Sequence, residues 1–149
     1  MTRPDDATLH VLVAPLSARA WLPQKAHRMD AGFDLAIPTN YTLGAREHLM
    51  IDLEIAMQIP QGWYGQIFGR SSVFQRGLAV HPGVIDADYR GPIRLLVYNH
   101  TTTTQALLSG DRLAQLVLLP VPAVTLTPVT PNELSQTTRG TGGLGSTGR

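Results

Sequence analysis

Several short stretches place charged or hydroxyl side chains beside glycine, the combination that a phosphate-binding site requires. GRSS, residues 69–72, offers the guanidinium group of Arg70 and the hydroxyl groups of Ser71 and Ser72. Arginine donates two parallel hydrogen bonds to a phosphate, and hydroxyl groups add neutral donors. A surface loop that happens to carry one arginine explains GRSS equally well when the stretch is taken alone.

Carboxylates occur in two further stretches. Asp34 lies inside the apolar frame AGFDL, and Asp86 and Asp88 are two residues apart in GVIDADYRG. One carboxylate of this pair could activate water as a general base while the other stabilises a turn. Taken alone, Asp34 is better explained as the cap of a turn, and the pair could belong to a polar hairpin.

GDRLAQL, residues 110–116, begins as a turn and continues as a strand that carries Gln115. Its Asp111 either holds an arginine such as Arg70 in position or only begins the turn. The chain ends on RGTGGLGSTGR from Arg139, which satisfies G-x-G-x-x-G. A dinucleotide fingerprint needs a helix after this loop, and no residues remain to form one.

The elements that must position these residues are predicted to be short β-strands. Between residues 49 and 59 apolar side chains occupy every second position, which is typical of one strand with a single buried face. HVLVAPL, IRLLVYN and RLAQLVLLPV are further apolar runs of strand length, separated by turns rich in glycine and proline. SSVFQRG predicts one helical turn that Gly77 ends. The pattern favours an all-β sandwich, jelly roll or barrel.

Composition narrows the class of protein. The 149 residues are 43% hydrophobic and 15% charged, which predicts one compact domain. A net charge of +1 argues against extended contacts with nucleic acid, and the absence of cysteine excludes disulfides and thiolate metal sites. The apolar run near the N-terminus is too short for a signal peptide or membrane span. We therefore expect a cytoplasmic protein that binds neither membrane nor nucleic acid.

Taken together and in this order, AGFDL, GRSS, GVIDADYRG, GDRLAQL and RGTGGLGSTG closely resemble the five motifs of the trimeric dUTPase family. The resemblance implies a jelly-roll-like β domain of the β-clip type over residues 1–135 and a mobile glycine-rich tail over residues 136–149. It implies a homotrimer with active sites shared between chains. It further implies Mg²⁺-dependent hydrolysis of dUTP to pyrophosphate and dUMP, the precursor for thymidylate synthesis.

The resemblance also implies a role for each motif. Asp34 would contact the metal only through water, because Mg²⁺ is held mainly by phosphate oxygens and waters. Tyr89 would pack under the deoxyribose and exclude a ribose hydroxyl group. The implied catalytic residues are Asp86, which would activate water for attack on the α-phosphorus, and Arg70, Ser71 and Gln115, which would contact the phosphates with Ser72.

The remaining implied contacts surround the base and the tail. The uracil edge would be read by the backbone at Val80 and in a tight hairpin through Val84, Ile85 and Arg94. The tail would close over bound nucleotide without a following helix, since successive glycine N–H groups can form an anion site. Its implied contacts are Arg139, Gly145, Ser146 and Thr147 on the phosphates and Leu144 over the base, where the family usually has a stacking phenylalanine.

Two other functions remain open. GRSSVFQRGLAVH also resembles the dCTP deaminases, but these enzymes need a glutamate at the position of Leu96. A nucleotide-responsive regulatory protein could be built on the same trimer. The intact catalytic motifs favour hydrolysis over both.

Overall fold

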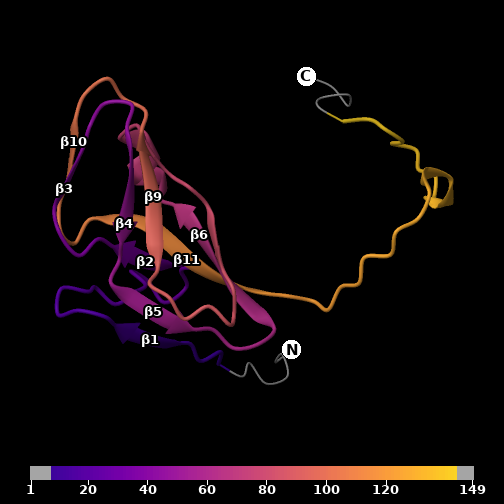
Figure 1. The fold of residues 1–149 in the computed structure, drawn as a ribbon, viewed down its shortest axis with the longest axis horizontal. Helices are drawn as coiled ribbons and strands as arrows, with labels where there is room; N and C mark the ends of the chain where they lie inside the picture. The colour runs from indigo at the N-terminus through magenta and orange to yellow at the C-terminus, as the bar shows by residue number, and fades with distance from the viewer. Residues whose placement is uncertain (1–7, 144–149) are drawn as a thin grey trace.

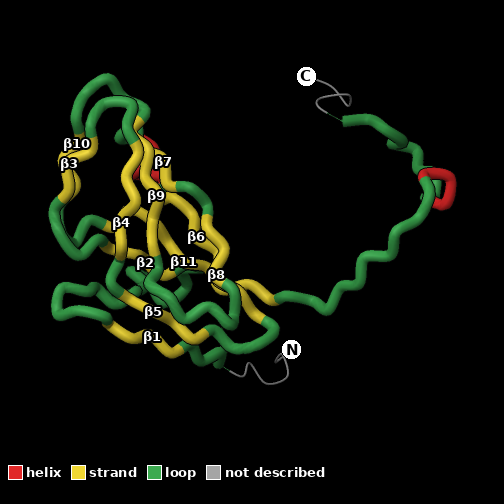
Figure 2. Tube along the Cα trace, in the orientation of Figure 1, coloured by secondary structure: helices red, strands yellow, loops and turns green. Residues whose placement is uncertain are grey.

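The computed structural model describes residues 8–143 and forms them almost entirely into antiparallel β-strands (Figure 1; Figure 2). No helix among these residues is long and apolar enough to cross a membrane. The strands are β1 (Leu12–Pro15), β2 (Phe33–Ala36), β3 (Tyr41–Leu43), β4 (His48–Asp52), β5 (Ile55–Gln58), β6 (Trp63–Gly69), β7 (Leu78–Val80), β8 (Gly83–Ile85), β9 (Arg94–Asn99), β10 (Gln105–Leu107) and β11 (Arg112–Pro120). The short helices are α1 (Ser71–Gln75) and the 3₁₀ turn η1 (Pro131–Glu133).

Within residues 8–143 the strands form four sheets, in the orders β2-β11-β6-β8, β4-β9-β7, β1-β5 and β3-β10. The pair β3 and β10 lies at one end of the body, and β1 with β5 lies at the other (Figure 1). Aliphatic side chains from both larger sheets fill the core between them, among them Leu35, Ile67, Leu95, Val97 and Leu116. Burying such side chains is the dominant favourable contribution to folding.

The alternating run at residues 49–59 forms two strands, so the prediction of a single strand was wrong. β4 ends at Asp52 and β5 begins at Ile55, and Glu54 between them has a φ angle of 57°. β4 pairs with β9, whereas β5 pairs with β1. Leu53 is buried at the break, so the alternation of burial continues through it. Hydrophobic periodicity alone therefore could not reveal the interruption.

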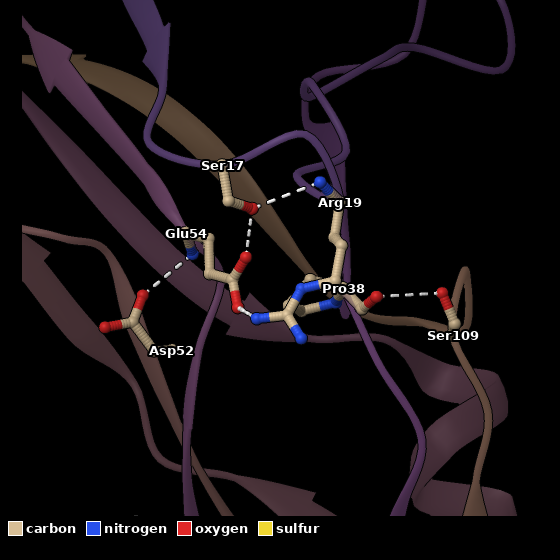
Figure 3. A network of polar contacts seen from close by, with 6 residues as sticks. All are labelled: Ser17, Arg19, Pro38, Asp52, Glu54 and Ser109. Atoms are coloured by element: carbon tan, nitrogen blue, oxygen red, sulfur yellow. Dashed lines mark hydrogen bonds and ion pairs between the residues drawn. The ribbon is translucent and has the colours of Figure 1, made fainter.

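A polar network ties the segment before β2 to this break (Figure 3). The guanidinium group of Arg19 lies 2.5 Å from one carboxylate oxygen of Glu54, and the hydroxyl group of Ser17 donates to the other. The backbone N–H of Glu54 donates to Asp52 Oδ1 at 2.7 Å. The hydrogen bond from Ser17 is the main cause that lowers the pKa of Glu54. The carboxylate is thus held in its ionised form.

Asn99, the last residue of β9, is fully buried and connects three loops. Its side-chain N–H groups donate to the carbonyl oxygens of Leu43, Gly44 and Thr103 at 3.2, 2.9 and 2.8 Å. Its carbonyl oxygen accepts from the backbone N–H of Thr101 at 2.9 Å and from the hydroxyl group of the same residue at 2.7 Å. Every polar atom of this buried amide therefore has a partner.

We expect Asn99→Ala to lower the free energy of unfolding by about 3 kcal/mol, because it leaves several buried polar groups without partners. Urea unfolding at one fixed protein concentration measures the change. Asn40→Ala is the matched control, since Asn40 is exposed and accepts one hydrogen bond from the backbone of Ser109 at 2.8 Å. We expect Asn40→Ala to lower the free energy of unfolding by about 1 kcal/mol or less. Equal losses in the two variants would contradict the structural role assigned to Asn99.

After β11 the chain leaves the body of strands as an extended segment that carries η1 (Figure 1). Residues 121–141 are exposed throughout. Apolar side chains on this segment are uncovered, with Val124 71% and Leu126 89% exposed. Apolar side chains left uncovered in this way are uncommon on the surface of a folded domain.

Candidate active site

Nine of the predicted site residues line one of two pockets. The first has a volume of about 310 Å³ and lies between β8, β9 and the turn that joins them. We call it the turn pocket; its lining includes Val84, Ile85, Asp86, Tyr89 and Arg94. The second has a volume of about 500 Å³ and lies at the start of α1. We call it the arginine pocket; its lining includes Arg70, Ser71, Val80 and Gln115.

The turn pocket differs from the tight hairpin that we expected. β8 pairs with β6 and β9 pairs with β4 and β7, so the joining segment links strands of two different sheets. The backbone N–H of Tyr89 donates to the carbonyl oxygen of Asp86 at 3.1 Å and closes the turn. β8 is the last strand of its sheet, so within residues 8–143 one edge of its backbone has no strand neighbour. Such an edge presents N–H and C=O groups that can pair with a ligand.

Tyr89 forms a fixed wall of the turn pocket. Its hydroxyl group donates to the carbonyl oxygen of Pro92 at 2.9 Å, which holds the ring across the turn. A Cβ atom on Gly91 would lie only 2.4 Å from that hydroxyl oxygen, so glycine leaves the room that the ring occupies. Asp86 is exposed and lines the same pocket. Arg94 lines it too, and its Nε atom lies 3.5 Å from Asp52 Oδ2.

The arginine pocket is lined by β7, α1, Gln115 of β11 and Arg70, the residue that leads into α1, and Asp34 of β2 reaches it only through its contact with Arg70. Asp34 on β2 and Gln115 on β11 are direct cross-strand partners, so their side chains share one face of the sheet. Arg70 Nε lies 3.1 Å from Asp34 Oδ1. A Cβ atom on Gly32 would lie 2.6 Å from Gln115 Oε1, so the glycine lets this amide pack against the chain before β2. The first, second and fourth motifs therefore meet in one place.

Asp111 takes the turn role among the two that the sequence left open. Its carboxylate accepts from the backbone N–H of Leu108 at 3.0 Å. Its Oδ2 atom lies 3.7 Å from Arg76 Nη1, so Asp111 forms an ion pair with Arg76 and not with Arg70. The carboxylate that contacts Arg70 is that of Asp34, which lies on β2, the strand beside β11, and not in the turn that precedes β11.

Two residues near Arg70 were given no role from the sequence: Phe74, which lines the arginine pocket, and Arg112, which lines the smaller polar pocket beside it. Arg112 Nη1 lies 3.3 Å from Asp34 Oδ2, so this carboxylate contacts two guanidinium groups. Phe74 on α1 lines the pocket although its side chain is 73% exposed. The signal for Phe74 was its position in SSVFQ, three residues after Ser71 on a predicted helical turn. Arg112 stands in the fourth motif, GDRLAQL, but strict alternation along the strand would place it on the face opposite to Gln115.

Within residues 8–143, the predicted site residues do not all lie at one place. No residue lines both pockets, so Asp86 and Arg70 belong to separate sites on one chain. Val80 lines the arginine pocket and not the turn pocket, and Ser72 lines a smaller polar pocket of about 250 Å³ beside Arg70. Arg139 lies on the extended segment, where its Nε atom donates to the carbonyl oxygen of Gly142 at 2.8 Å. Outside the described residues lie Leu144, Gly145, Ser146 and Thr147.

Comparison with known proteins identifies the family of this chain. Residues 18–148 match the family model described as dUTPase. The deoxyuridine 5'-triphosphate nucleotidohydrolase of Yarrowia lipolytica is 39% identical over 137 residues, which cover 91% of this chain and 87% of that protein. The enzyme of the same name from Oryza sativa subsp. japonica is 37% identical over 139 residues, covering 91% and 79%.

Solved structures show the same fold. The Staphylococcus bacteriophage 80alpha dUTPase with dUpNHpp matches with a TM-score of 0.88 at 27% identity, covering 94% of this chain and 99% of that one. A mutant dUTPase from phage phi11 of S. aureus, solved to show the coordination of a structural Mg(II) ion, matches with a TM-score of 0.77 at 27% identity, covering 84% and 99%. The predicted jelly-roll-like β-clip domain is thus confirmed. Five ordered motifs, a family match over most of the sequence and a shared fold agree: the chain belongs to the dUTPase family.

Proposed function

We propose that this dUTP diphosphatase hydrolyses dUTP to dUMP and pyrophosphate as a homotrimer whose active sites draw on more than one chain. The reaction is supported by the relatives, which are named for it. Sharing is supported by one observation: Asp86 and Tyr89 line one pocket, while Arg70 and Gln115 line another. In a symmetric oligomer, a second chain can bring its arginine pocket to the turn pocket of the first.

In this mechanism Asp86 takes a proton from the water that attacks the α-phosphorus. The bond from the α-phosphorus to the bridging oxygen breaks, and pyrophosphate leaves. Asp86 is exposed beside Tyr89, where a bound deoxyribose would bring the α-phosphate close to it. Arg70, Ser71 and Gln115 orient the phosphates and offset their charge, which supplies much of the catalysis in phosphoryl transfer.

Selectivity for dUTP follows from the turn pocket. The edge of β8 that has no strand neighbour within residues 8–143 supplies backbone donors and acceptors to the edge of uracil, as it could to a neighbouring strand. The ring of Tyr89 is held by its hydroxyl group and packs under the deoxyribose, where a 2′-hydroxyl group would collide with it. A methyl group on C5 or an amino group on C4 of the base would find no complementary space or partner along this edge.

Magnesium fits this site as an ion carried by the triphosphate. Among residues 8–143 no three metal-ligating side chains lie close enough to hold an ion by themselves. Asp34 already contacts two guanidinium groups, so it would reach the ion only through water. Bound to the phosphate oxygens, Mg²⁺ would neutralise part of the charge that repels an attacking nucleophile.

The segment after β11 supports the trimer and the closing tail. Its uncovered apolar side chains find cover when the segment lies along a neighbouring chain. The residues that follow, 136–149, then form a separate tail that covers a neighbouring active site, with Arg139 on the terminal phosphate. The other proposed tail contacts are those of Leu144, Gly145, Ser146 and Thr147. The dUMP produced would serve thymidylate synthesis, and the cytoplasmic location stays a prediction.

Purified protein with Mg²⁺ is expected to release pyrophosphate from dUTP at least about a hundredfold faster, in kcat/KM, than from dTTP, dCTP or UTP. The physical reason is the fixed edge of β8 and the fixed ring of Tyr89. Pyrophosphate release is measured for each nucleotide under the same conditions. Equal release from all four would contradict the role of the turn pocket.

The two alternative functions predict different outcomes of this assay. A deaminase would convert dCTP to dUTP, but Leu96 lines the turn pocket with an apolar side chain that cannot transfer a proton. A regulatory protein would bind dUTP and release no pyrophosphate. Turnover of dUTP alone therefore favours hydrolysis over both.

A further inference from the structure

We propose that Arg112 is a positioning residue that keeps the guanidinium group of Arg70 available for the phosphates by occupying one oxygen of Asp34. This inference rests on the proposed function and assigns a role to a residue outside the predicted site. It concerns three charged side chains on β2, β11 and the start of α1.

Asp34 lies between the two arginines. Its Oδ1 atom is 3.1 Å from Arg70 Nε, and its Oδ2 atom is 3.3 Å from Arg112 Nη1. The side chain of Asp34 is 14% exposed and that of Arg70 is 29% exposed, whereas that of Arg112 is 53% exposed, so water screens the pair with Arg112 more than the pair with Arg70. Arg70 Nη1 also donates to the backbone carbonyl oxygen of Arg112 at 3.3 Å. The described contacts of Arg70 therefore use Nε and Nη1, which leaves Nη2 for a ligand.

An arginine and a carboxylate left to themselves prefer a forked pair with two parallel hydrogen bonds. Arg112 prevents this pair by holding Oδ2, so Asp34 offers only Oδ1 to Arg70. Without Arg112, both oxygens of Asp34 become available, and the fork of Arg70 turns onto its own carboxylate. The phosphate chain would then compete with Asp34 for the same guanidinium group.

The net charge of Asp34, Arg70 and Arg112 also favours the binding of phosphate. Two guanidinium groups and one carboxylate carry a net charge of +1 beside the polar pocket that Arg70, Ser72 and Arg112 help to line. Charge alone and positioning make opposite predictions for Asp34. If charge alone mattered, removing this carboxylate would strengthen phosphate binding; if Asp34 positions Arg70, removing it weakens binding.

The test measures the Kd of dUpNHpp by calorimetry for the full chain and for Asp34→Asn, Arg112→Gln and the double variant. We expect each single change to raise Kd about tenfold, and the double variant to bind no more weakly than Arg112→Gln, since coupled residues are not additive. The losses should persist when EDTA replaces Mg²⁺. In turnover of dUTP, the change should appear mainly in KM rather than in kcat.

Arg19→Gln is the matched control, because it removes an arginine–carboxylate pair that lies on Glu54 and touches neither pocket. It should leave Kd unchanged. Tighter binding by Asp34→Asn, unchanged binding by Arg112→Gln, or a loss that vanishes in EDTA would each overturn the inference. Because dUpNHpp binding needs no turnover, the result is readable even if the proposed hydrolysis fails.

Discussion

Asp86→Asn is expected to lower kcat for dUTP by about a thousandfold, because a general base contributes roughly 10² to 10⁴ to the rate. Asparagine has nearly the shape of aspartate but cannot accept a proton from water at neutral pH. Since Asp86 is exposed and lines the turn pocket, the exchange leaves the core and the pocket wall in place. Single-turnover pyrophosphate release measures the chemical step, and calorimetry with dUpNHpp measures binding. Binding should change little.

Asp88→Asn is the matched control for this prediction. Asp88 lies two residues further along the same turn and is exposed, but it is not among the residues that line the turn pocket. The sequence pattern alone could not distinguish the two carboxylates. We expect Asp88→Asn to retain kcat within about threefold, as is usual for a surface substitution. Equal losses in both variants, or full activity of Asp86→Asn, would exclude Asp86 as the base.

Much of the fold could be predicted from local patterns in the sequence. Alternation and apolar runs located strands such as β4, β9 and β11, and SSVFQRG predicted the helical turn α1 that Gly77, with a φ angle of 77°, follows. Pairing between strands could not be predicted in the same way. Whether β8 turns back on β9 or joins a different sheet depends on contacts far apart in the sequence. The turn pocket exists because the two strands separate.

The role of Arg112 was hidden by a β-bulge. Arg112 and Gln115 are three residues apart, and strict alternation would place them on opposite faces of β11. In the structure the register shifts between Arg112 and Ala114, so Arg112 pairs with Ala36 while Gln115 pairs with Asp34. The extra residue brings both side chains to the face that carries Asp34. A sequence shows where a bulge is tolerated, but the register of the partner strand decides whether it forms.

In the proposed homotrimer, two inactive variants are expected to restore each other's dUTP turnover. Arg70→Gln removes the guanidinium group from the arginine pocket and should lose about 10² or more in kcat, as removal of one charge-stabilising donor does. It is co-expressed with Asp86→Asn under two different tags and purified over both. Every mixed trimer then has one site with an intact Asp86 from one chain and an intact Arg70 from the next. We therefore expect about one third of the native dUTP turnover.

This fraction separates the shared site from its alternatives. A trimer of two Asp86→Asn chains and one Arg70→Gln chain has one intact site, and so does the reverse composition, because each site draws its two residues from adjacent chains. If both residues came from the same chain, no site would be intact, and activity would stay at the level of the single variants.

Mixing Asp86→Asn with Gln115→Ala should also restore activity, since Gln115 lines the arginine pocket. Mixing Arg70→Gln with Gln115→Ala should not, because both changes damage the same pocket. The pairs that restore activity thus show which residues one chain contributes to a given site. We expect residues of the same pocket to come from the same chain.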